Sequence, residues 1–141
     1  MKTLDLVLLV EDDDLVNFYN EFLLKELNIA KEVVIARNGR EGLDYLEKCD
    51  ANPGECPYPD LILLDINMPI MNGFEFMEEY ENRELDRRAK MLVVMLTTSM
   101  HPQDRERANS FPSIYEYLYK PLLETAILPV VNRYFENIEG N

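Results

Sequence analysis

Short apolar runs alternate with amphipathic stretches along most of the chain. Two of the runs contain only apolar side chains, which is typical of strands buried on both faces of a parallel sheet. The run at residues 4–10 has a single polar residue and is also predicted to be a buried strand. The run at residues 32–36 is short and β-branched, and the run at 114–119 alternates only weakly. We therefore predict five strands, at residues 4–10, 32–36, 61–64, 91–96 and 114–119.

The stretches between the runs carry apolar residues at steps of three and four, the spacing of one helix face. In the first stretch we expect Phe18, Tyr19 and Phe22 to pack into the core. Pro129, inside the last stretch, is expected to kink that helix or shift its start. Residues 81–90 are highly charged and are expected to form a helix end and a loop. The predicted helices occupy residues 15–27, 40–48, 74–80, 102–109 and 122–135.

Strict alternation of strand and helix predicts an α/β fold with right-handed crossovers. Such crossovers build a parallel sheet with helices on both faces. The length of 141 residues suits one domain. We found no internal repeat and no linker, so we expect a single domain over residues 1–141.

Composition and charge narrow the function. The chain has 14 basic and 27 acidic residues, and its net charge of −13 argues against direct nucleic-acid binding. No apolar run approaches the ~18 residues of a membrane span, and residues 1–5 lack the apolar core of a signal peptide. We therefore expect a cytoplasmic protein without a membrane contact.

The segment 50–59 contains three prolines and a glycine and is predicted to be a long loop. A tolerated surface insertion is favoured over a partner contact, because long surface insertions cost little stability. Cys49 and Cys56 flank most of this loop. In the cytosol we expect both to stay reduced; a disulfide closing the small loop is the less favoured alternative.

Polar side chains follow four of the five predicted strands. Glu11, Asp12 and Asp13 follow the first strand, and Asp65 follows the third. The fourth strand leads into a run of hydroxyl residues at 97–99, and Lys120 follows the fifth. The carboxyl ends of parallel strands lie at one edge of a sheet, where open α/β sheets bind ligands. We therefore expect these side chains to lie close together.

Crowded carboxylates repel one another, and a divalent cation would relieve that repulsion. Mg²⁺ prefers oxygen ligands, often one or two carboxylates with phosphate oxygens. A lysine attracts a phosphate as a point charge, and an aspartate carboxylate is a known nucleophile for phosphoryl groups. This set of side chains predicts a site for a phosphoryl group, held either on a bound ligand or on Asp65.

Four segments resemble the receiver domain of two-component response regulators, the CheY-like family. The resemblance covers essentially the whole chain. It implies a flavodoxin-like, doubly wound sheet in the order 2-1-3-4-5, formed by a stand-alone receiver without an output domain. The matching segments are residues 8–13, 61–69 with Gly73, 96–97 and 117–121.

By this resemblance Asp65 is the phosphoacceptor. Asp12 would bind Mg²⁺ directly and Glu11 through water, with the backbone carbonyl of Asn67 as a further ligand. Lys120 would pair with the phosphate, and its bond to the following proline is typically cis in the family.

The resemblance also implies two switch residues. Tyr117 matches the aromatic position of the switch. Thr97 is preferred as the switch hydroxyl when the count starts from the following helix, whereas a count back from Lys120 favours Thr98. We choose Thr97, because residues 110–113 contain what looks like a one-residue insertion.

The expected function is a phosphorylation switch, in which a sensor histidine kinase or a histidine phosphotransfer protein phosphorylates Asp65 and a downstream protein reads the result. Such a protein would catalyse its own phosphotransfer and dephosphorylation and would not be an enzyme acting on other substrates. One alternative is a magnesium-dependent phosphatase with an aspartate nucleophile, which would need an acid where Asn67 stands. A nucleotide or flavin binder would need a glycine-rich loop where four acids follow the first strand. The remaining alternative is a docking module that works without phosphorylation.

Overall fold

Five parallel strands form one sheet in the predicted order, β2-β1-β3-β4-β5. The computed structural model describes residues 2–83 and 91–139, so most of the predicted loop at 81–90 lies outside the described residues. The strands are β1 (Leu4–Val10), β2 (Ala30–Ala36), β3 (Leu61–Leu64), β4 (Leu92–Thr97) and β5 (Ile114–Tyr119). The helices are α1 (Asp14–Glu26), α2 (Gly39–Ala51), α3 (Gly73–Glu81), α5 (Pro102–Asn109) and α6 (Glu124–Glu139).

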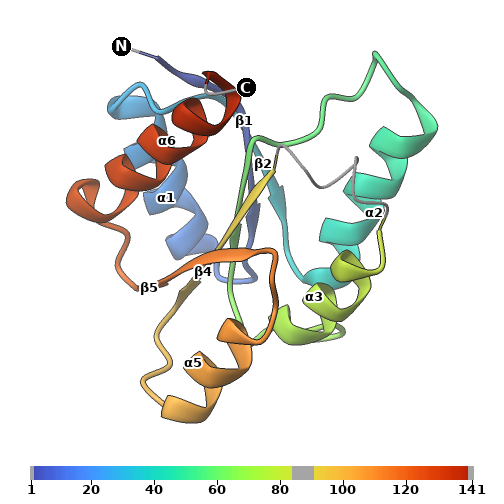
Figure 1. Cartoon of the computed structure of the whole chain (residues 1–141), viewed down its shortest axis with the longest axis vertical. Helices are drawn as coiled ribbons and strands as arrows, with labels where there is room; N and C mark the ends of the chain where they lie inside the picture. The colour runs from blue at the N-terminus through green and yellow to red at the C-terminus, as the bar shows by residue number, and fades with distance from the viewer. Residues whose placement is uncertain (1, 84–90, 140–141) are drawn as a thin grey trace.

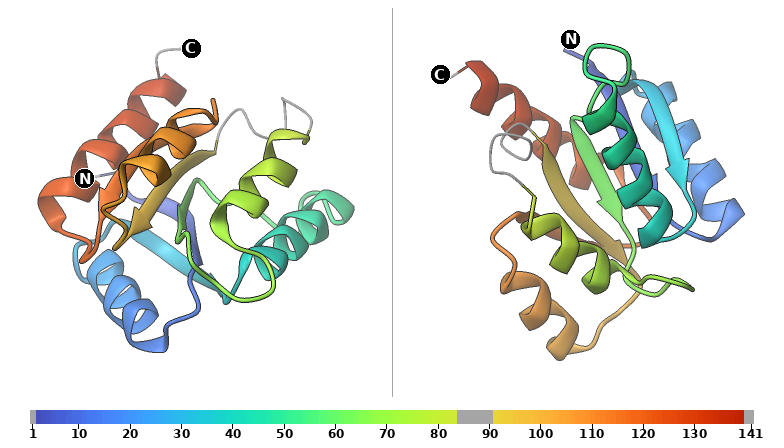
Figure 2. Two further views of the ribbon diagram at one scale, coloured as in Figure 1. Left: turned by 90° about the horizontal axis from the view of Figure 1, so that it is seen from below. Right: turned by 90° about the vertical axis from the view of Figure 1, so that its right-hand side faces the viewer.

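Helices cover both faces of the sheet (Figures 1 and 2). Helices α1 and α6 lie on one face, and α2 and α3 lie on the other with α5 beside them. Alternate residues of the central strands point to opposite faces of the sheet. Ile62 and Leu64 pack toward α2 and α3, whereas Leu61 and Leu63 pack toward α1 and α6. Since β3 is buried on both faces, its four residues are all apolar. Helix α6 begins at Glu124 and keeps Pro129 inside it.

Helix α1 corrects one prediction, because its large apolar side chains face outward. Phe18 is 73% exposed, Phe22 58% and Tyr19 40%, so the expected core packing of these three residues is wrong. The buried residues of α1 are Asn17, Asn20 and Leu24. The Asn17 amide Nδ2 donates to the Glu11 carbonyl oxygen at 2.9 Å. This hydrogen bond holds the buried face of the helix where apolar packing was expected.

The outward orientation of the apolar side chains of α1 can be tested with two substitutions. Leu24 is fully buried, so Leu24→Ala is expected to lower the free energy of unfolding by about 2–5 kcal/mol. Phe18→Ala is expected to change it by less than about 0.5 kcal/mol, because an exposed side chain loses little packing. Denaturant titration of both variants measures the difference. Equal losses from the two substitutions would place Phe18 in the core after all.

The connection from α2 to β3 corrects a second prediction. Cys49 and Cys56 form a disulfide, so the expectation that both stay reduced is wrong in this structure. The chain turns back after α2, with Gly54 at a φ of +88°, and this turn brings the two Cα atoms within 4.7 Å. The disulfide is the alternative that the sequence left less favoured.

Candidate functional site

Strand pairing places Asp65 directly beside the acids that follow β1. Val10 pairs with Leu64, and the Asp65 amide donates to the Val10 carbonyl oxygen at 3.0 Å. The next residue after Val10 is Glu11. The two chain segments therefore leave the sheet side by side at its carboxyl edge, as predicted.

Three carboxylates gather at this edge. Glu11, Asp12 and Asp65 each offer an oxygen, and these oxygens all lie within 4.8 Å of one another. Asp13 does not join them, because its side chain caps α1 by accepting from the Leu15 amide at 2.9 Å. Of the four acids that follow β1, the structure places two in the cluster.

Lys120 lies against two of these carboxylates. Its Nζ is hydrogen-bonded to Glu11 Oε1 and lies 3.5 Å from Asp65 Oδ1. The Lys120 amide donates to the Thr97 carbonyl oxygen at 2.9 Å, which fixes the residue beside the end of β4. The bond from Lys120 to Pro121 is cis, as the resemblance implied.

When no cation is bound, burial and crowding make the charged forms of Glu11 and Asp65 less favourable than they are in water. Burial, reinforced by the charge of Asp65, raises the pKa of Glu11 to about 6 despite the hydrogen bond from Lys120. Burial also raises the pKa of Asp65, against the attraction of Lys120. One lysine does not offset three carboxylates. A small divalent cation with oxygen ligands fits this donor set, and Glu11, Asp12 and Asp65 are the residues that would hold it.

This balance predicts how stability depends on pH. The pKa of Glu11 is higher in the folded chain than its ordinary value of 4.5, so its contribution is complete below pH 4.5 and is lost as the pH rises through about 6. In metal-free buffer the wild type should lose about 2 kcal/mol relative to Glu11→Gln across that window. Denaturant unfolding with and without Mg²⁺ tests this, because Mg²⁺ should restore the wild type at neutral pH. A pH-independent difference between the two proteins would contradict the assignment.

The two threonines at the end of β4 differ in their surroundings. Thr97 is fully buried, and its Oγ1 accepts from the Ser99 amide at 3.1 Å. Thr98 is exposed and lines a cavity beside Lys120. Both lie at the site, so the choice of Thr97 as switch hydroxyl stays a prediction. Thr97→Ala and Thr98→Ala form a matched pair for testing it.

Tyr117 is already turned inward. It is 5% exposed, and its hydroxyl donates to the Ser99 carbonyl oxygen at 3.2 Å. The Arg105 guanidinium lies over the Tyr117 ring, 5.5 Å from its centre. Ser99 in turn donates to Asp104 Oδ2 at 2.5 Å. Sequence reasoning missed these contacts to α5, since the partners come from separate elements and share no motif.

The loop from β3 to α3 passes close to Asp65. A Cβ atom added to Gly73 would lie 2.2 Å from the Asp65 carbonyl oxygen, so only glycine fits there. The Gly73 amide donates to the Ile66 carbonyl oxygen at 2.8 Å. These contacts hold the loop against the strand end, with Asn67 exposed at its surface.

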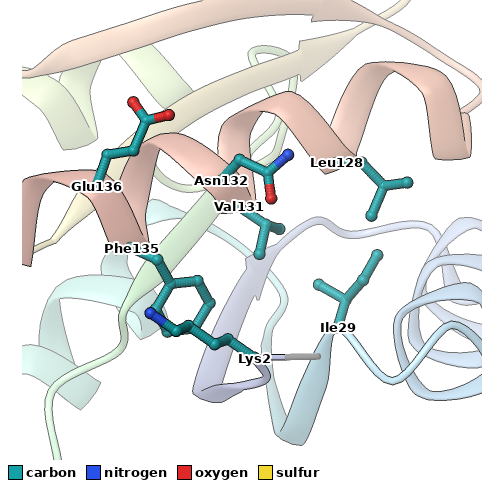
Figure 3. A pocket seen from close by; sticks show the side chains of 7 residues that line it. All are labelled: Lys2, Ile29, Leu128, Val131, Asn132, Phe135 and Glu136. Atoms are coloured by element: carbon teal, nitrogen blue, oxygen red, sulfur yellow. The ribbon is translucent and has the colours of Figure 1, made fainter. Parts of the chain in front are cut away.

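Two cavities lie at opposite ends of the sheet. One, of about 380 Å³, opens beside Lys120 between the start of α1 and the residues that follow β5. The other, of about 390 Å³, lies between α6 and the amino-terminal end of β1, with Lys2 over the Phe135 ring (Figure 3). Only the first adjoins the acidic cluster.

Among residues 2–83 and 91–139, no helix combines the length and apolar character that a membrane span needs.

Comparison with known proteins agrees with this fold. The family model of the response regulator receiver domain matches residues 7–132. A two component response regulator from Cytophaga hutchinsonii is 28% identical, with a TM-score of 0.86 over 96% of this chain and 99% of that one. The Mn²⁺-bound form of response regulator Rcp1 is 29% identical, with a TM-score of 0.69 over 94% and 92%.

Among curated relatives, the probable methanogenesis regulatory protein FilR2 of Methanothrix harundinacea is 32% identical over 83% of this chain and 72% of its own length. Several other relatives are longer, and the chain spans between 15% and 65% of their length. With the matched family model, these similarities show that the chain belongs to the response regulator receiver domains of two-component signalling.

Proposed function

We propose that the chain is a phosphorylation switch in which Asp65 accepts a phosphoryl group from a phosphohistidine. The observation that carries the proposal is the position of Lys120, whose ammonium group lies against both Glu11 and Asp65. A partly buried lysine between two carboxylates can supply the counter-charge for a phosphoryl group that arrives on one of them.

In the proposed reaction, a carboxylate oxygen of Asp65 attacks the phosphorus atom. The phosphorus–nitrogen bond to the donor imidazole breaks, and that nitrogen leaves with the electron pair. Lys120 offsets the negative charge on the transferring oxygens. Later, water attacks the phosphorus atom, so inorganic phosphate leaves and the Asp65 carboxylate returns.

Magnesium is the proposed cofactor. Glu11, Asp12, Asp65 and the backbone carbonyl of Asn67 would hold it. When bound, the cation supplies positive charge for the phosphoryl oxygens. The raised pKa values of Glu11 and Asp65 support the need for it, and the related Rcp1 structure contains Mn²⁺.

The proposed switch uses Thr97 and Tyr117. A phosphate adds about −1.5 to −2 charge, which would draw the Thr97 hydroxyl toward it. The Thr97 oxygen would then give up its bond to the Ser99 amide, and Ser99 also carries the contact to Tyr117. Phosphorylation would thereby shift the balance between inward and outward positions of Tyr117 and change the surface of α5 and β5.

The outward face of α1 supports a protein phosphodonor. Leu15 is 80% exposed, and with Phe18, Tyr19 and Phe22 it forms an apolar stripe at helical spacing. The stripe starts beside Asp12 and borders the cavity next to Lys120. A helix of a sensor histidine kinase or of a histidine phosphotransfer protein would cover this stripe. We propose the cytoplasm as the location and a second protein as the downstream target.

Exposure to a small phosphodonor such as acetyl phosphate tests the proposal without a partner. With Mg²⁺, intact mass spectrometry should show one phosphoryl group per chain, and chelation of the metal should prevent uptake. A protein that stays unmodified with Mg²⁺ would refute the proposed function and leave the docking module as the better account.

Phosphate uptake and turnover by the same protein distinguish a phosphorylation switch from a phosphatase. A general acid two residues after the nucleophile is absent, since Asn67 stands there and a carboxamide does not transfer that proton. We expect at most one equivalent of phosphate taken up and slow release from the protein. Many turnovers of a phosphate monoester would identify an enzyme instead.

A further inference from the structure

The disulfide lies at the end of the sheet opposite the acidic cluster. Cys49 is in the last turn of α2, and Cys56 lies on the segment between α2 and β3. Cys49 is fully buried, whereas Cys56 is 9% exposed and follows the exposed residues 51–55. The proposed phosphoryl chemistry uses neither sulfur atom.

Hydrogen bonds hold the two cysteines near each other without help from the covalent bond. The Asn52 side-chain amide donates to the Lys48 carbonyl oxygen at 2.8 Å and thereby caps α2. The Asn52 carbonyl oxygen then accepts from the amides of Glu55 and Cys56, each at 3.1 Å. These bonds fold the chain back, so the sulfur atoms meet with little further loss of entropy.

Side-chain contacts also hold the residues on either side of this turn. Asp50 is paired with Arg83, just after α3, at 2.7 Å, and accepts a hydrogen bond from the Tyr58 hydroxyl. The Tyr45 hydroxyl donates to the Pro57 carbonyl oxygen at 3.0 Å. Because these contacts do not depend on the sulfur–sulfur bond, we expect its reduction to free only the short turn and to leave the fold in place.

We propose that Cys49 and Cys56 are a reversible thiol–disulfide couple, a modification site that locks the turn between α2 and β3 when oxidised. A thiolate of a dithiol reductant attacks Cys56, the more accessible sulfur. The Cys49–Cys56 bond breaks, and Cys49 leaves as a thiolate that takes up a proton. The second thiol of the reductant then displaces Cys56. Two electrons pass to the protein, the reductant becomes a disulfide, and the reverse exchange with a small disulfide reoxidises the pair.

The short loop that the disulfide closes favours a reversible couple over a permanent stabilising bond. The two cysteines are seven residues apart, and a small closed loop gives the least entropic stabilisation. In a reducing compartment such bonds are usually transient. The structure thus has a preorganised pair whose bond adds modest stability, and Cys56 is the less buried of the two residues.

Equilibration of the native wild-type chain in glutathione buffers of increasing oxidised fraction tests the couple. Free thiols are then alkylated in denaturant and counted by intact mass. We expect a single transition from two thiols to none, with the same midpoint from either direction. A pair that stays reduced in every buffer, or a bond that resists excess dithiothreitol in the native protein, would overturn the proposal.

Thermal unfolding and hydrogen exchange give a second measurement. Oxidised protein should melt about 5–10 °C higher than reduced protein, and amides of residues 51–57 should exchange more slowly. The double variant Cys49→Ala/Cys56→Ala is the matched control and should show no response to redox conditions. Equal melting temperatures and equal exchange in the two wild-type forms would show that the bond locks nothing.

Discussion

Asp65→Asn is expected to abolish phosphoryl uptake from acetyl phosphate while leaving the fold intact. A carboxamide lacks the nucleophilic oxygen that forms the acyl phosphate. The substitution also removes one of the crowded carboxylates, so the metal-free variant should unfold at the same or a higher denaturant concentration than the wild type. Intact mass after treatment with donor and Mg²⁺ measures uptake, and circular dichroism measures folding.

Asp13→Asn is the matched control for this substitution. Asp13 follows the same strand as the cluster acids, but its side chain caps α1, and asparagine caps a helix about as well. This variant should take up phosphate as the wild type does. If Asp65→Asn retained wild-type uptake, or if Asp13→Asn lost it with its fold intact, the assignment of roles at this edge of the sheet would be wrong.

Lys120→Met is expected to slow phosphoryl uptake by about 10²–10³-fold, the usual effect of removing one preorganised charge or donor from a transition state. The reason is geometric: Lys120 Nζ lies 3.5 Å from Asp65 Oδ1 and is hydrogen-bonded to Glu11. Methionine keeps much of the side-chain length and removes the charge. The rate of adduct formation at saturating Mg²⁺ is the quantity to measure.

Lys120→Arg provides the control for charge alone. It keeps the positive charge but replaces the compact ammonium by a planar fork, so an intermediate rate is expected. The same assay can be applied to the Thr97→Ala and Thr98→Ala variants. Loss of the Thr97 hydroxyl should change the rate of phosphoryl uptake or the lifetime of the phosphorylated protein more than loss of the Thr98 hydroxyl. A Lys120→Met protein that takes up phosphate at the wild-type rate would remove the observation on which the proposed function rests.

The sheet and the site were largely predictable from sequence because each depends on local pattern. The wholly apolar runs before Asp65 and Thr97 mark buried parallel strands, and parallel strands bring their carboxyl ends to one edge. The convergence of Glu11, Asp12, Asp65 and Lys120 follows from that topology. The different roles of the acids do not follow from the topology. Asp13 caps α1 because its backbone lies at the start of that helix, and the sequence does not distinguish it from Asp12.

Helix α1 shows where pattern reasoning fails. Its strongest apolar periodicity, at Leu15, Phe18 and Phe22, marks the outward face, while Asn17 and Asn20 are buried. Periodicity identifies an apolar stripe but not what covers it. A buried asparagine that binds the Glu11 carbonyl oxygen is visible only once β1 and α1 are placed together.

The disulfide and the surroundings of Tyr117 depend on tertiary contacts for the same reason. The cysteines meet because Asn52 and Gly54 reverse the chain, and the expectation of two thiols rested on compartment alone. Tyr117 is surrounded by Ser99 and Arg105, which lie outside the motif that singled it out.

The most direct measurement locates the phosphoryl group itself. The wild-type chain is treated with acetyl phosphate and Mg²⁺ and reduced with borohydride, which converts an aspartyl phosphate to homoserine, and the peptides are then sequenced by mass spectrometry. The account predicts homoserine at position 65. Reduction of an acyl phosphate at Glu11 or Asp12, with position 65 unchanged, would contradict it.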